Sequence, residues 1–453
     1  MNPHPDAQDI ATTFRKELSD VNLWWTRALV IAAAAAAGLT VVGFTWLTDH
    51  ALHLFEGLRT WSRWTPLVWT PVCTAAIVWL TRRFAPGATG SGIPQVMASV
   101  DPSVPRDQRH LFVSLKLSLA KILLSTWGLL GGLSLGREGP SVQVAAGVMH
   151  SIRRWLPERA VVSDHGLLVA GGAAGIAAAF NTPLAGVMFA IEELSRSPEQ
   201  RSSGLLVAGI VLAGLIGVSI DGNGTYFGMI HAVSVGASLL LPGLLVAVAS
   251  GLAGGLFSRL MYASLAGRSP DKFSQWRRRW PVRFAAFCGL AVAVIGVVSG
   301  GDTFGSGYSH SRAMLEAQQA EPTIYVLLKF MATWLTAWSG VPGGIFAPCL
   351  SIGGALGNDI AALTSYPQAS TLIALGMAGF LAAATQAPLT AFVIVMEMVD
   401  GHAMVLSLMA CALIANAISK LLGQPLYGAL SQLQLARLPA AQAHEQANEI
   451  NRA

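Results

Sequence analysis

Three short motifs in this sequence place small residues ahead of a proline that opens an apolar stretch. They are Gly90-Ser-Gly-Ile-Pro94, Gly136-Arg-Glu-Gly-Pro140 and Gly344-Ile-Phe-Ala-Pro348. Proline suits the first turn of a helix, where no amide hydrogen is needed, so each motif predicts a loop that leads into a helix N-terminus. Helix N-termini carry free amide hydrogens and about half a positive charge. Several of them directed at one point would bind an anion without a lysine.

The elements that position these motifs are predicted to lie in a membrane. The chain has 453 residues, of which 53% are hydrophobic and only 12% are charged. Soluble domains carry roughly 25% charged residues, so this chain lacks the charge to cover a water-facing surface. The composition favours an all-α polytopic membrane protein and argues against a soluble enzyme and against disorder. Four isolated cysteines in apolar stretches indicate buried thiols, with no metal site expected.

The chain contains an internal repeat with breaks at matching places. Pro183-Leu184 and Glu192 recur in the same order as Pro388-Leu389 and Glu397, about 200 residues later. Pro183 and Pro388 each interrupt an apolar segment. Such irregular backbone is tolerated at membrane depth only where it is buried or lines a cavity. An inverted-topology repeat of two halves with broken and re-entrant helices is therefore expected.

The distribution of arginine predicts the orientation and the domain boundaries. Arginines gather in short connections such as Arg82-Arg83, Arg153-Arg154 and 277–279, which we assign to the cytoplasm together with both termini. The expected organisation is listed in chain order: a cytoplasmic N-terminal surface helix (1–22), a first transmembrane half (23–220), a second transmembrane half (221–430) and a short cytoplasmic C-terminal tail (431–453).

Glu138 of the second motif is the acidic residue most suited to couple an anion to a proton. Charge is costly at membrane depth, and desolvation and a nearby anion both favour the protonated form of a carboxylate. Glu138 could take up a proton when an anion comes close and occupy the anion's place when ionised. An ion pair with Arg137 is the alternative, but adjacent residues on a helix do not face each other.

The three motifs, in this order, resemble those of the CLC family of chloride channels and proton-coupled chloride exchangers. The resemblance extends over about residues 23–430. Two further segments support it: Phe180-Asn-Thr-Pro-Leu-Ala-Gly186, which leads to Glu192 and Glu193, and Gln424-Pro-Leu-Tyr427. It implies a CLC-like fold, transport of chloride and protons across a lipid bilayer, and a homodimer with one pathway per subunit. A bacterial inner membrane is the expected location, without the regulatory CBS pair of many eukaryotic relatives.

The resemblance also implies roles for particular residues. The hydroxyls of Ser91 and Tyr427 and the backbone amides of Ile345 and Phe346 would bind a central chloride. Glu138 would be the gating glutamate, whose carboxylate competes with chloride for a neighbouring position.

An inner proton-transfer role is implied for Glu193. Exchangers of the family keep a glutamate at this position, and channels often do not. The alternative for Glu193 is a solvated carboxylate at a helix end, which is also how we interpret Glu192.

Chloride/proton exchange is thus the predicted function, with a passive voltage- or pH-gated chloride channel on the same fold as the alternative. The chain is not expected to be an enzyme, to need a cofactor or to bind nucleic acid. An intramembrane protease would need a GxSG serine or a GxGD aspartate, and a P-loop pump would need GxxxxGK[ST]; none of these patterns occurs.

Overall fold

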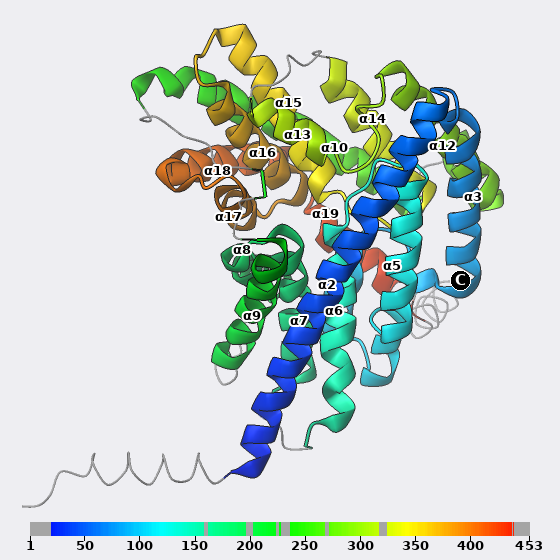
Figure 1. Ribbon diagram of the computed structural model, residues 1–453, viewed down its shortest axis with the longest axis vertical. Helices are drawn as coiled ribbons and strands as arrows, with labels where there is room; N and C mark the ends of the chain where they lie inside the picture. Colours follow the sequence, from blue (N-terminus) through cyan, green and yellow to red (C-terminus); the bar gives the residue numbers. More distant parts are fainter. Residues whose placement is uncertain are drawn as a thin grey trace, which may run out of the picture.

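The computed structural model describes residues 20–157, 162–195, 203–222, 226–227, 236–267, 271–316, 324–436 and 438. Within these residues the chain is built from helices, as predicted (Figure 1). Residues 1–19 of the expected N-terminal surface helix and most of the expected C-terminal tail lie outside the described residues.

The first half begins with the longest helix, α2, which runs diagonally across the molecule (Figure 1). Its α-helices are α2 (Val21–Trp61), α3 (Pro66–Phe84), α4 (Ile93–Val100), α5 (Leu115–Leu130), α6 (Glu138–Ser151), α7 (Asp164–Phe180), α8 (Pro183–Phe189) and α9 (Ser203–Asp221). The short 3-10 segments are η1 (Pro86–Ala88), η2 (Arg106–Leu111) and η3 (Ile152–Trp155), and α8 continues into a π-helical turn, η4 (Ala190–Leu194).

The second half continues through ten α-helices in the described residues. They are α10 (Leu240–Ala266), α11 (Lys272–Arg279), α12 (Pro281–Val298), α13 (Tyr308–Leu315), α14 (Ile324–Ser339), α15 (Phe346–Thr364), α16 (Ala369–Thr385), α17 (Pro388–Met398), α18 (Val405–Leu422) and α19 (Leu426–Leu435). Two 3-10 turns, η5 (Ala237–Leu239) and η6 (His402–Met404), precede α10 and α18.

The surface and the interior have the polarity expected of a membrane protein. In the described residues, six helical segments are long and apolar enough to cross a bilayer: Val21–Trp61, Arg106–Leu130, Leu240–Ala266, Pro281–Val298, Phe346–Thr364 and His402–Leu422. On α5, Leu115, Leu119 and Leu123 are at least half exposed at helical spacing, whereas Lys121 is fully buried. A soluble helix would show the opposite pattern, so the leucine face suits lipid.

Two apolar stretches of the sequence are broken in the structure at equivalent residues. Asn181 separates α7 from α8 and Gln386 separates α16 from α17, each in the left-handed conformation with φ near 60°. An amide side chain tolerates this conformation at a helix C-terminus, and the prolines at 183 and 388 then begin the next helix. The predicted pair of breaks is present.

The two halves meet at a backbone bridge between equivalent glycines. The amide of Gly136 donates to the carbonyl of Gly344 at 2.8 Å, and the amide of Gly344 donates to the carbonyl of Gly136 at 2.7 Å. The bridge is antiparallel, as expected when a two-fold axis relates the two segments. It ties the second and third motifs together at the junction of the halves.

The halves also exchange helix caps. The Glu192 carboxylate accepts from the amides of Leu389 and Thr390 at the start of α17, at 3.0 and 2.6 Å. The Glu397 carboxylate accepts from the equivalent amides of α8, at 3.1 and 2.7 Å. A carboxylate at a helix N-terminus satisfies free amides and complements the helix dipole. Glu192 is therefore not the solvated carboxylate that the sequence suggested, because it caps a helix of the other half.

We expect Glu397→Gln to lower the free energy of unfolding by about 1–2 kcal/mol, because a half-buried cap loses its charge at the start of α8. Thermal unfolding in detergent measures the change. Glu316→Gln is the matched control, since Glu316 pairs with Arg312 on an exposed helix face and should contribute less than about 0.5 kcal/mol. Equal effects of the two substitutions would contradict a stabilising cap.

Candidate functional site

The three proline motifs meet at one place in the interior. The amide of Gly343 donates to the carbonyl of Gly90 at 3.1 Å, which joins the third motif to the first. A Cβ added at Gly139 would lie 2.3 Å from the Ser91 hydroxyl, and one added at Gly344 would lie 3.0 Å from the Gly139 amide. The loops approach too closely for side chains here, so glycine is required at both positions.

A cavity of about 90 Å³, here called the Ser91 cavity, lies beside this meeting point. Ser91, Ile345 and Tyr427 line it. The Tyr427 side chain is fully buried and its hydroxyl faces Ser91. Neither hydroxyl makes a hydrogen bond of ordinary geometry to the described residues, although buried polar groups normally find partners. The Phe346 ring packs on Tyr427 with centroids 5.8 Å apart, so four of the predicted anion-site residues lie together.

Glu138 is fully buried at the first turn of α6. Its carboxylate lies beside the backbone amides of Glu138 itself and of Ala347, the latter in the first turn of α15. Neither carboxylate oxygen makes a hydrogen bond of ordinary geometry to the described residues. A Cβ added at Gly136 would lie 2.2 Å from this carboxylate, so the glycine leaves it room. The carboxyl group thus lies where two helix N-termini converge, in a place suited to an anion.

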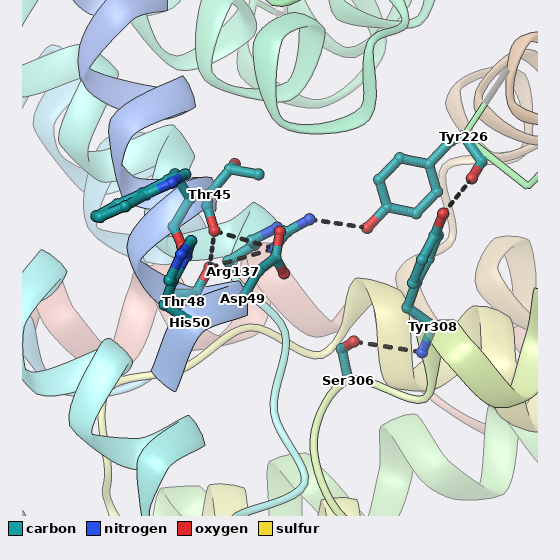
Figure 2. A network of polar contacts seen from close by, with 9 residues as sticks. Thr45, Thr48, Asp49, His50, Arg137, Tyr226, Ser306 and Tyr308 are labelled. Carbon is teal, nitrogen blue, oxygen red and sulfur yellow. Dashed lines mark hydrogen bonds and ion pairs between the residues drawn. The ribbon is translucent and has the colours of Figure 1, made fainter. Parts of the chain in front are cut away.

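Arg137 joins a polar network at α2 (Figure 2). Its guanidinium pairs with Asp49. It also donates to the Thr48 hydroxyl at 3.2 Å and to the Tyr226 hydroxyl at 3.4 Å. These partners support the expectation that Arg137 and Glu138 do not pair with each other.

Two larger cavities are lined by residues that neighbour the site residues in the chain. The Arg137 cavity, of about 570 Å³, is lined by Arg137 and Asp49 together with Tyr226 and Tyr308. The Glu193 cavity, of about 300 Å³, is lined by the half-buried Glu193 and by residues of α19 beginning at Gly428. Gly428 follows Tyr427 in the chain, and α19 contributes residues to both the Glu193 cavity and the Ser91 cavity.

A buried lysine supports the first motif and was missed in the sequence. Lys121 is fully buried and donates to the carbonyls of Ala88 and Gly90, at 2.5 and 2.7 Å. Lys121 directly precedes the uncharged apolar run that begins at Ile122, and it was not among the predicted site residues. The available signal was the position of Lys121 within the apolar sequence of α5. Lys329 holds the carbonyls of Thr303 and Gly305 in the same way in the second half.

Comparison with protein families identifies the chain. The model of the family described as "Voltage gated chloride channel" matches residues 73–420, which is more than half of the sequence. The chain belongs to the CLC family.

Characterised CLC relatives are similar over most of their length. The H(+)/Cl(-) exchange transporter ClcA of Salmonella paratyphi B is 31% identical over 426 residues, covering 89% of this chain and 84% of the relative. ClcA of Citrobacter koseri is 31% identical over 383 residues, covering 80% of this chain and 77% of the relative. Both relatives are named as transporters.

Solved CLC structures share the fold. A slow cyanobacterial Cl-/H+ antiporter superposes with a TM-score of 0.76 at 26% identity, covering 91% of this chain and 98% of that chain. A CLC-type fluoride/proton antiporter superposes with a TM-score of 0.70 at 22% identity, covering 90% of this chain and 98% of that chain. The predicted CLC-like architecture of broken helices in two halves is confirmed.

Proposed function

We propose that this protein is an antiporter that exchanges chloride for protons across a membrane. The observation that carries the proposal is the Glu138 carboxylate, which is fully buried between the N-termini of α6 and α15. An acid in an anion's position can release that position only by moving or by taking up a proton. Proton uptake and anion entry are thereby linked at one site.

In this proposal the Ser91 cavity holds the central chloride. The Ser91 and Tyr427 hydroxyls donate to the ion, and the backbone amides of Ile345 and Phe346 complete its shell. Their support is the shared cavity and the two buried hydroxyls described above. Neutral donors and helix dipoles bind an anion weakly enough to let it leave, which rapid transport requires.

Glu193 is proposed to pass protons between the cytoplasm and Glu138. It lines a cavity of about 300 Å³ that shares α19 with the Ser91 cavity, so a proton carrier in that cavity can reach its carboxylate.

The proposal extends to the two halves, the orientation of the chain and its assembly. The halves are residues 23–220 and 221–430, both termini lie in the cytoplasm, and two copies assemble in the inner membrane of a bacterium with one pathway each. Apolar side chains exposed on α8 and α17, such as Leu184 and Leu389, offer a surface for the second copy. These helices lie side by side (Figure 1).

A passive chloride channel on the same fold is the alternative, since the matching family model carries a channel's description. The exchange names of the relatives and the presence of Glu193 favour the antiporter.

Proton uptake by proteoliposomes decides between the two. We expect purified protein in liposomes to drive protons against their gradient when a chloride gradient is imposed, because each chloride that moves displaces the Glu138 carboxylate. A pH electrode records proton uptake and a chloride electrode records chloride efflux from the same vesicles. Chloride efflux without proton movement would identify a channel, and empty liposomes provide the baseline.

A further inference from the structure

An aromatic residue between the two halves contacts the arginine that precedes the gating glutamate. Tyr226 is half-buried and lines the Arg137 cavity. Its hydroxyl accepts from the Arg137 guanidinium at 3.4 Å (Figure 2). Tyr226 belongs to neither the three motifs nor the repeat, so nothing in the mechanism proposed above uses it.

The position of Tyr226 is fixed by contacts from both halves. Its backbone carbonyl accepts from the Tyr308 hydroxyl at 2.8 Å, and the two rings pack edge to face with centroids 4.7 Å apart. The Phe180 ring of α7 packs edge to face on the other side at 5.7 Å. The next residue, Phe227, donates its amide to the carbonyl of Met398 at the end of α17. Aromatic pairs of this geometry are favourable beyond their buried area.

Arg137 is held by the first half on one side and by Tyr226 on the other. Thr45 and Thr48 of α2 accept its hydrogen bonds, and Asp49 pairs with its charge. Only 12% of the Arg137 side chain is exposed. Because Arg137 and Glu138 are consecutive, a displacement of the guanidinium changes both the field at the Glu138 carboxylate and the backbone that carries it.

We propose that Tyr226 is a positioning residue for Glu138, acting through Arg137. This inference rests on the proposed antiport function and adds a residue to it. The Tyr226 hydroxyl contacts the Arg137 guanidinium on the side that α2 does not reach. The packed Tyr226 ring keeps that hydroxyl in place. Proton and chloride exchange between Glu138 and the Arg137 cavity therefore depends on Tyr226, a residue from the connection between the halves.

Other ionisable groups around this cavity must be distinguished from Tyr226 in any test. They are Asp49, His53 and Glu56 of α2, Tyr308 and Arg312 of α13, and Arg137 itself. A simple shift of the pH profile could arise at any of them, so the test compares two backgrounds at one pH.

The experiment combines Tyr226→Phe, which removes only the hydroxyl, with Glu138→Gln. In the otherwise unaltered protein, Tyr226→Phe should slow chloride-driven proton uptake by roughly three- to ten-fold, the effect of one hydrogen bond of ordinary strength. In the Glu138→Gln background, which lacks the titrating carboxylate, it should leave chloride efflux unchanged. An unaltered rate in the first background, or an equal fall in chloride efflux in both, would overturn the proposal.

Two further variants keep the test decisive if Tyr226→Phe is poorly folded. Tyr308→Phe alone should slow proton uptake, because it loosens Tyr226. Arg137→Lys removes the guanidinium that Tyr226 contacts. Adding Tyr308→Phe to Arg137→Lys should therefore cause no further loss of proton uptake. A further loss in the double variant would contradict the proposal. Tyr262→Phe on α10, which lies outside the Arg137 cavity, is the matched control. Proton uptake by the unaltered protein is measured first, so failure of the antiport function is recognised separately.

Discussion

Glu138→Gln is expected to reduce chloride-driven proton uptake by about 100-fold or more, the loss typical of removing a proton-transfer group. Glutamine has nearly the same shape as a protonated glutamate, but it cannot release a proton or carry a negative charge. The side chain would therefore no longer occupy the place of an anion at the N-termini of α6 and α15. Chloride efflux should continue and should lose its dependence on pH. Paired pH and chloride electrodes on one vesicle preparation measure both fluxes.

The control for Glu138→Gln is Glu316→Gln, which removes an exposed carboxylate and should leave both fluxes intact. Size-exclusion chromatography of the two variants checks that each remains folded. Proton uptake that stays strictly proportional to chloride movement in Glu138→Gln would remove this residue from the gate.

Glu193→Gln is expected to abolish proton uptake while chloride efflux persists and keeps its dependence on pH. The side chain lines the Glu193 cavity and not the Ser91 cavity, so its loss interrupts the proton route without disturbing chloride binding. Retained pH dependence separates this variant from Glu138→Gln. The difference arises because the gating carboxylate still titrates when only the inner residue is replaced.

Glu192→Gln provides a matched control one residue away. Its carboxylate caps α17, so the variant should be less stable to heat but should still couple protons to chloride. If Glu193→Gln still takes up protons, or if Glu192→Gln loses coupling to the same extent, the inner proton route has been assigned to the wrong residue.

The fold class and the helix starts at the three motifs could be predicted from the sequence because both depend on local signals, whereas the meeting of the motifs followed from the resemblance to the CLC family. A proline after small residues marks a helix start wherever it occurs, and low charge content marks a membrane protein. The breaks near Pro183 and Pro388 were predictable for the same reason. The third motif separates α14 from α15, as its small residues and proline predict.

The side-chain partners could not be predicted, because they join residues far apart in the chain. Arg137 pairs with Asp49, and no pattern in either segment specifies the other. Glu192 resembles any carboxylate at a helix end until α17 is placed against it. Tyr226 lies in a connection without a periodic hydrophobic pattern. Its contact with Arg137 arises only from the way the two halves pack.

The exchanged carboxylates bear on how such a molecule could have arisen. Glu192 of the first half satisfies α17, and Glu397 of the second satisfies α8, so each broken helix obtains its cap from the opposite repeat. A half-length ancestor would have left those amides bare unless a second identical polypeptide supplied the acid. Gene fusion would then have preserved an interface that already existed between separate copies. In a single chain, the residues that follow the two capping acids can differ. Glu193 follows Glu192, whereas Met398 follows Glu397.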